Sequence, residues 1–247
     1  MAKTVADEKK KLRAIIGECR DALSFEAAGA RSECVQRQVL VSAEYRDASA
    51  AVLYAAKGNE VATDAIFTDA IASGRAVFYP RIEADPKDPA ARVIVARRVR
   101  DRAELVRGVF GIMAPSESAE PLDRRKFSKI IICVPGVAFG IKGQRLGRGE
   151  GYYDRFLGQF GTEAISVGLA YSFQLLDPIP ETGRDRRLNI IVTESDVYRA
   201  CDTPLPAREA RTKEVNPGGT NHRNPGIHSW WRGLIFLADN EPAQGRR

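Results

Sequence analysis

The sequence feature that most constrains the fold is the apolar run KIIICVP at residues 129–135, which contains three consecutive isoleucines. A strand with one face in water alternates apolar and polar residues, whereas this run would be apolar on both faces. Such a strand is typical of a parallel sheet that is buried on both sides. The run therefore predicts a central strand of an α/β fold.

Strand and helix patterns alternate on both sides of this run. We expect further strands at residues 52–54, 76–80, 91–99, 164–171 and 189–195, and helices at residues 7–23, 32–45, 60–74 and 151–160. Ser32 is the expected N-cap of the second helix, and Gly74 is the expected end of the third. The order predicts a three-layer α/β/α domain with a mainly parallel sheet over residues 1–200.

The chain changes character after residue 200. Residues 201–247 are rich in Pro, Gly, Asn and charged side chains, and we expect a flexible polar tail that carries a short apolar island with both tryptophans. The chain has no apolar run of about 18 residues and no signal-peptide pattern, so we expect no membrane contact and a cytoplasmic location.

Composition argues against several other classes of function. The net charge is +6, but the basic residues are spread along the chain without interleaved aromatics, so no nucleic-acid partner is expected. The four cysteines lack C-x-x-C spacing, and both histidines, His222 and His228, fall in the tail. We therefore expect neither a zinc site nor a histidine-dependent catalytic triad.

The most informative stretch is PGVAFGIKGQRLGRGEGYYDRFL at residues 135–157, which follows the strongest strand and precedes an expected helix. Ligands of open α/β sheets bind beyond the carboxyl ends of strands, and glycines let a backbone approach an anion closely. Arg145 and Arg148 add positive charge, and Asp154 is a plausible Mg²⁺ ligand. The spacing matches neither the Walker loop nor the dinucleotide fingerprint. Taken alone, a structural turn with solvated arginines fits this stretch as well.

The full string is more specific. RLGRGEGYYDRFL, preceded by VPGVAF, resembles the signature of the 5-formyltetrahydrofolate cyclo-ligase family, PG-x-AF…G-x-RLG-x-G-x-GYYDR-x-L. Weaker features of that family occur in the same order over residues 5 to 198: K-x-x-L-R at 9–13, EVAT at 60–63, FYPR at 78–81, VFGI at 109–112, GLAY at 168–171 and Asp185 before NIIVTE.

This resemblance implies a fold similar to the sugar-phosphate isomerase and coenzyme-A transferase group. It also implies a reaction in which ATP and 5-formyltetrahydrofolate give 5,10-methenyltetrahydrofolate, ADP and phosphate, with Mg²⁺. The formyl oxygen attacks the γ-phosphate, N10 attacks the activated carbon, and phosphate then departs. Such chemistry needs positioning and charge neutralisation rather than a protein nucleophile.

The resemblance also implies roles for individual residues. Lys9 and Arg13 would reach the ATP phosphates; without the loop match, an exposed basic helix face would be the better explanation for them. The nucleotide cradle, with Arg145 and Arg148 as its catalytic cations, would consist of Arg145, Gly147, Arg148, Gly149, Gly151, Tyr152 and Tyr153.

The remaining roles concern the metal and the folate. Asp154 and Asp185 would hold Mg²⁺. Glu60 would grip the pterin, with a helix N-terminal charge as its alternative role. Tyr54 would wall the folate pocket, with an ordinary core aromatic as the alternative. The expected partners are ATP and a reduced folate. The expected oligomeric state is a monomer.

Three positions depart from the family pattern. Gly140 stands where the family commonly has Asp, Ala114 replaces an acid, and Arg184 stands where many bacterial members have His. They leave open an alternative function, a non-catalytic relative that binds a nucleotide or another phosphorylated metabolite as a sensor or accessory factor. The arginine-rich segment 184–187 predicts a preference for polyglutamated folate.

Overall fold

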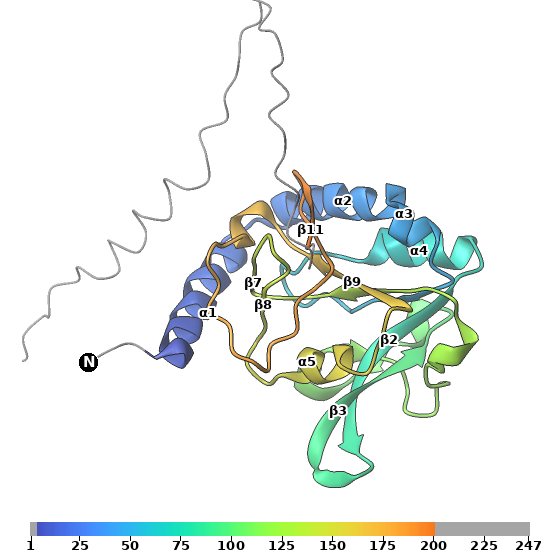
Figure 1. The fold of residues 1–247 in the computed structure, drawn as a ribbon. Coiled ribbons are helices and arrows are strands. Elements are labelled where there is room, and N and C mark those ends of the chain that lie inside the picture. Colours follow the sequence, from blue (N-terminus) through green and yellow to red (C-terminus); the bar gives the residue numbers. More distant parts are fainter. Residues whose placement is uncertain (1–3, 201–247) are drawn as a thin grey trace, which may run out of the picture. The chain divides into compact units, whose positions relative to one another are not determined.

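The computed structural model describes residues 4–200, and the predicted tail at residues 201–247 lies outside the described residues. A sheet of seven strands runs through the domain in the order β11-β10-β9-β6-β1-β2-β3 (Figure 1). The strands are β1 (Ala50–Val52), β2 (Ala76–Asp85), β3 (Asp88–Arg98), β6 (Ile130–Val134), β9 (Ala164–Leu169), β10 (Ile190–Val192) and β11 (Val197–Arg199). Strands β10, β9, β6, β1 and β2 are parallel to one another, and only the edge strands β3 and β11 are antiparallel. The prediction of a mainly parallel sheet is confirmed.

Both faces of the sheet are covered. Alternate residues of β6 point to opposite faces, with Ile131 and Cys133 in one buried cluster and Ile130 and Ile132 in another. The first cluster contains side chains of α2 (Phe25–Val41), α3 (Ala43–Arg46) and α4 (Asp64–Ala72). The second contains Phe156 of α5 (Tyr152–Leu157). The unbroken apolar run of β6 thus has the physical cause inferred from the sequence, burial on both sides.

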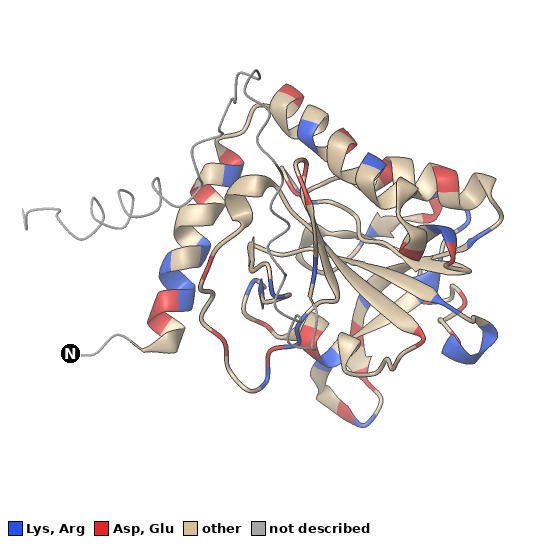
Figure 2. Cartoon of the chain, turned by 45° about the horizontal axis from the view of Figure 1, so that its top comes forward, with Lys and Arg blue, Asp and Glu red and all other residues tan. Residues whose placement is uncertain are grey.

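Helix α1 (Val5–Asp21) lies at one end of the sheet, beside β7 (Ala138–Phe139) (Figure 1). A capping box starts it: the Thr4 hydroxyl accepts from the Asp7 N–H, and the Asp7 carboxylate accepts from the Thr4 N–H. Basic and acidic residues are mixed along α1 and α2 (Figure 2). Among residues 4–200, no helix has the length and apolar character needed to cross a membrane.

The second predicted helix was wrong at its start. Helix α2 begins at Phe25 with Ser24 as its N-cap, whereas Ser32 is buried inside the helix, where its hydroxyl lies 3.0 Å from the Tyr171 hydroxyl. The first turn of α2 exposes Phe25 to solvent, so the apolar periodicity that marks a helix begins only later. Gly74 does end α4 as predicted, with φ of +75°.

Three hairpins were not predicted. Strands β2 and β3 are longer than predicted and pair as one antiparallel hairpin. The glycine-rich stretch contains a second hairpin, formed by β7 and β8 (Arg145–Leu146). A third joins β4 (Val106–Arg107) to β5 (Met113–Ala114). The 3₁₀ turns are η1 (Arg102–Glu104), η2 (Val109–Gly111), η3 (Arg124–Lys126) and η4 (Ser172–Gln174). Helix α4 begins only at Asp64, so Glu60 lies in the segment before it.

Candidate active site

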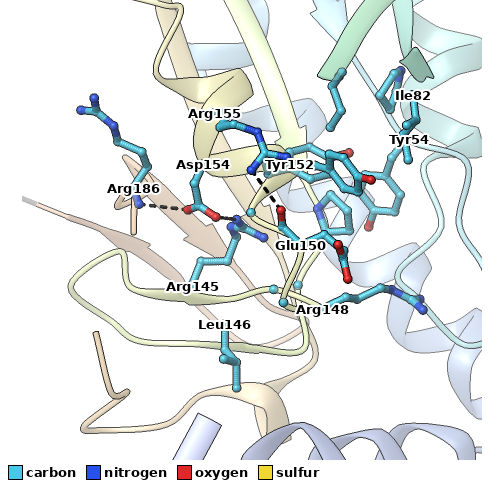
Figure 3. A pocket seen from close by; sticks show the side chains of 18 of the residues that line it. Tyr54, Ile82, Arg145, Leu146, Arg148, Glu150, Tyr152, Asp154, Arg155 and Arg186 are labelled. Carbon is cyan, nitrogen blue, oxygen red and sulfur yellow. Dashed lines mark hydrogen bonds and ion pairs between the residues drawn. The ribbon is translucent and has the colours of Figure 1, made fainter. Parts of the chain in front are cut away.

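A cavity of about 1140 Å³ opens beyond the carboxyl ends of β1 and β6 and beside the part of β2 that extends past β1. Tyr54 follows β1, Pro135 follows β6, and Arg81 and Ile82 belong to β2; open α/β sheets bind their ligands at this end of the strands. The other walls come from α1, the segment 108–114, the loop 145–151 with α5, and the segment 182–186. Figure 3 shows side chains converging on this space from several of these elements. The cavity therefore joins segments that are far apart in the sequence.

The β7–β8 hairpin delivers Arg145 to the cavity. Gly140 N–H donates to the Gln144 carbonyl, which closes the hairpin and places Arg145 in β8. The chain then turns into α5 through Gly149, with φ of +117°, and Gly151, with φ of +66°. Residues other than glycine rarely adopt these backbone angles, so the turn itself requires the two glycines.

Arg145 forms a buried ion pair with Asp154. Its Nη2 lies 3.0 Å from Asp154 Oδ2, and the Arg145 side chain is only 4% exposed. Asp154 Oδ1 accepts the Arg186 N–H at 3.0 Å (Figure 3). The guanidinium also lies over the Tyr153 ring, 5.5 Å from its centroid. Arg145 is thus held in one place by a carboxylate and an aromatic face.

A close approach of backbone to side chain keeps Arg145 in this position. A Cβ atom on Gly147 would lie 2.6 Å from Arg145 Nη1, so no larger residue fits there without moving the guanidinium. Arg13 of α1 donates from Nε to the Gly147 carbonyl at 2.8 Å. Helix α1 is therefore attached to the glycine loop, and the two segments predicted to bind phosphate are neighbours.

Lys9 and Asp185 form the second ion pair, at 2.6 Å. Asp185 also accepts hydrogen bonds from the backbone N–H and the hydroxyl of Thr182. Partial burial raises the pKa of Asp185, but the hydrogen bonds from Lys9 and Thr182 outweigh it, so the net pKa lies below the ordinary value. Asp185 is therefore a carboxylate at neutral pH.

Glu60 and Arg148 form the third pair, with Arg148 Nη2 2.7 Å from Glu60 Oε1. The Glu60 side chain is 11% exposed, and its other oxygen accepts the Lys57 N–H at 3.0 Å. Burial first and the Glu60 charge second raise the pKa of Tyr153, which stays protonated. Each of three cations predicted to contact phosphate is thus paired with one of the three carboxylates predicted to bind metal or substrate.

Tyr54 combines the two roles considered for it. Its ring belongs to the buried core and its hydroxyl donates to the Val61 carbonyl at 2.7 Å, yet it also lines the cavity. Burial raises its pKa well above the ordinary value. It is therefore a rigid wall rather than a movable contact.

The structure also locates the positions that depart from the family pattern. Ala114 is buried and lines the cavity, and Arg184 lies at its rim with Arg186. Gly140 does not line the cavity: a Cβ atom there would lie 2.4 Å from the Gln144 Oε1 atom. The space beside Gly140 is therefore filled by the buried Gln144 side chain.

Metal binding has two suitable side chains but no preformed cage. Asp154 and Asp185 both line the cavity, and residues 4–200 contain no group of three or more His, Cys, Asp or Glu side chains suited to a metal ion. Mg²⁺ is commonly held by one or two carboxylates together with substrate phosphates, so this donor set fits Mg²⁺ that arrives with a nucleotide.

Sequence reasoning missed part of the lining. In the sequence, Arg81 is marked only by the FYPR string and residues 109–112 only by VFGI; in the structure, Arg81 Nη1 donates to the Pro115 carbonyl at 2.9 Å. Those strings were the available signals, but no spacing rule places them beside the glycine loop. The lining residues without a predicted role include Arg81, Ile82, Ile94, Val109, Phe110, Ile112, Glu150 and Arg155.

Comparisons with known proteins agree on one family. The sequence model described as "5-formyltetrahydrofolate cyclo-ligase family" matches residues 5–194. A probable 5-formyltetrahydrofolate cyclo-ligase of Schizosaccharomyces pombe is 30% identical over 206 residues, which cover 78% of this chain and 98% of that protein. The mouse 5-formyltetrahydrofolate cyclo-ligase is 26% identical over 199 residues, covering 78% and 97%. The solved structure of 5,10-methenyltetrahydrofolate synthetase from Aquifex aeolicus superposes with a TM-score of 0.68 at 31% identity, covering 83% of this chain and 99% of that one.

Proposed function

Because the chain belongs to the 5-formyltetrahydrofolate cyclo-ligase family, whose members are ATP-dependent ligases, we propose that it converts ATP and 5-formyltetrahydrofolate into 5,10-methenyltetrahydrofolate, ADP and phosphate. One observation carries this proposal. A single cavity brings together the cations of α1, the arginines of the glycine loop and the carboxylates at positions 60, 154 and 185. These groups suit transfer of a phosphoryl group to the formyl oxygen.

The cations of the cavity would act on the triphosphate. Lys9 and Arg13 would bind phosphate oxygens from α1, while Arg145 and Arg148 would stabilise the charge on the group being transferred. The glycine backbone and the Tyr152 and Tyr153 rings would complete the cradle. No histidine or cysteine lines the cavity among the described residues, and this chemistry requires neither.

We propose that Asp154 and Asp185 hold Mg²⁺ together with the nucleotide. When bound, Mg²⁺ would neutralise charge on the phosphates. On the protein side, Asp154 would release Arg145 and Asp185 would release Lys9, so both cations would become available to the triphosphate. Isothermal titration of ATP with and without Mg²⁺ tests this arrangement, and equal affinity in both conditions would contradict it.

We propose that the folate lies against Glu60 and Tyr54. A carboxylate can accept two N–H donors of the pterin once Arg148 has turned to the phosphates. Arg184 and Arg186 at the rim would attract the negative charge of a polyglutamate tail. Equal KM values for mono- and polyglutamated substrate would contradict this last point. We further propose that the protein acts as a cytoplasmic monomer, which size-exclusion chromatography and cell fractionation test.

The test of the reaction is spectrophotometric. Purified protein with 5-formyltetrahydrofolate, ATP and Mg²⁺ should form the methenyl product, which absorbs strongly in the near ultraviolet. Ala114 and Gly140 remove two acids that the family commonly has near this site, and they motivate the alternative, a nucleotide-binding relative without catalysis. Nucleotide binding without any methenyl product, even at high enzyme concentration, would favour that alternative.

A further inference from the structure

Phe110 stands out among the residues that line the cavity. Its side chain is 60% exposed, the second most exposed large apolar side chain in residues 4–200. It is also the only described residue other than glycine with positive φ, at φ 58° and ψ 17°. It belongs to neither buried cluster of the sheet. The ring thus makes no contribution to the core while its backbone adopts a conformation that glycine adopts more easily.

The hairpin around Phe110 fixes this conformation. Strands β4 and β5 pair Val106 with Ala114, and the Gly108 N–H donates to the Ile112 carbonyl at 2.8 Å. The Phe110 carbonyl accepts a hydrogen bond from Lys57 Nζ at 2.9 Å. The ring is therefore presented from a tethered tip rather than from a free loop.

The tether leads to the side of the cavity assigned to the folate. The backbone N–H of Lys57, whose amine holds the Phe110 carbonyl, donates to Glu60 Oε2 at 3.0 Å. Lys9 and Asp185 lie on the expected phosphate side of the cavity. Among the hydrogen bonds and ion pairs of residues 4–200, none joins the hairpin tip to either of them. Phe110 and Glu60 are thus connected through one residue.

From these observations we infer that the Phe110 ring covers the bound folate and packs against the flat ring system on the Glu60 side of the cavity, which makes Phe110 a specificity-determining residue for the folate. The inference rests on the function proposed above. An exposed aromatic ring on a strained backbone has a physical reason if a flat apolar ligand removes it from water. The adenine of ATP is also flat, and the connection to Glu60 favours the folate.

The substitution Phe110→Gly tests this inference because strain and contact act in opposite directions. Glycine removes the ring and relieves the positive φ, so the variant should unfold at the same temperature as the wild type or higher. The KM for 5-formyltetrahydrofolate should rise about tenfold with the KM for ATP unchanged, as loss of a stacked aromatic contact predicts. Phe110→Trp retains a ring and should keep a folate KM near that of the wild type.

Met113→Ala is the matched control, because Met113 is 42% exposed on the same hairpin but does not line the cavity. It should leave both KM values unchanged. An unchanged folate KM in Phe110→Gly, or a rise in the ATP KM instead, overturns the inference. So does a lower unfolding temperature with unchanged KM values, which would assign the ring a structural role. A wild-type protein that forms no methenyl product would instead contradict the proposed function, before any variant is compared.

Discussion

Arg148 donates a hydrogen bond of 2.7 Å to Glu60, across 88 positions of sequence, and both residues line the cavity. One partner is the cation expected at the phosphates, and the other is the carboxylate expected at the pterin. Arg148 is half exposed, whereas the Glu60 side chain is largely buried. The two halves of the proposed site therefore share one ion pair. While this pair is formed, Arg148 is not available to the phosphates and the paired oxygen of Glu60 is not available to the pterin.

Glu60→Gln removes the charge of this carboxylate while it keeps its size. We expect the KM for 5-formyltetrahydrofolate to rise at least tenfold, since a hydrogen bond to a charged group contributes about 1.5–3 kcal/mol. The ATP KM should change much less. Steady-state kinetics with each substrate varied in turn measures both values.

Glu44→Gln is the control for this change, because Glu44 pairs with Arg199 at 2.9 Å and does not line the cavity. Its KM values should equal those of the wild type. If the Glu60→Gln enzyme had the folate KM of the wild type, the prediction that Glu60 binds the folate would be wrong.

Arg145→Ala removes the buried cation of the cradle. We expect kcat/KM to fall by an amount equivalent to about 2–4 kcal/mol of transition-state stabilisation. The unfolding temperature should fall as well, because Asp154 loses its partner in a poorly solvated place. Kinetics are therefore measured well below the unfolding transition. Arg125→Ala, whose side chain is 90% exposed, should show neither effect.

Gly147→Ala introduces a methyl group 2.6 Å from the present position of Arg145 Nη1. The guanidinium must leave its present position in the cradle, so we expect an increase in the ATP KM and a lower kcat. Gly17→Ala in α1 is matched in chemistry, and its new Cβ would meet nothing within 4 Å. The free energy of unfolding of that control should be about 1 kcal/mol higher than that of the wild type, and its KM and kcat should be unchanged. Equal kinetics in both variants would show that the position of Arg145 does not matter.

Gly140→Asp restores the acid that the family commonly has at this position, but Gln144 occupies the space. We expect a loss of about 1–3 kcal/mol in the free energy of unfolding from overpacking. Adding Gln144→Ala should recover part of that loss, which a double-mutant cycle measures by chemical denaturation. Strict additivity of the two changes would rule out this steric coupling.

The Lys9–Asp185 pair gives the stability a predictable dependence on pH. The pKa of Asp185 is depressed below 3.8 in the folded state, so its contribution is fully present above that value and is lost as the pH falls through the folded pKa. Asp185→Asn should therefore be less stable than the wild type by about 1 kcal/mol near neutral pH. The difference should shrink below about pH 4, the ordinary pKa of an aspartate.

Thermal unfolding across this pH range measures the difference. Asp21→Asn serves for comparison, since the Asp21 side chain is 73% exposed and no comparable set of hydrogen bonds holds it. A difference between wild type and Asp185→Asn that persisted at the lowest pH would mean that the charge of Asp185 is not its source.

The layered α/β architecture could be predicted because it depends on local patterns. The isoleucines of β6 are apolar on both faces in any window, and the carboxyl end of that strand is where the glycine string begins. Element ends were less predictable: the first turn of α2 carries the exposed Phe25 and no apolar stripe, so no local pattern marks Ser24 as the N-cap. The β7–β8 hairpin depends on pairing within a glycine-rich stretch, which leaves no alternating pattern.

The amino-acid sequence by itself determined the family and the central strand, and it predicted which side chains would carry the chemistry, since these follow from residue types at fixed local spacing. Only the tertiary structure decided how these charges are paired, Arg145 with Asp154, Lys9 with Asp185 and Arg148 with Glu60. It also brought Phe110 to the cavity and connected it to Glu60 through Lys57. The physical reason is that two of these ion pairs join residues 88 and 176 positions apart, and the third, over nine positions, depends on how the β7–β8 hairpin places Arg145 against α5.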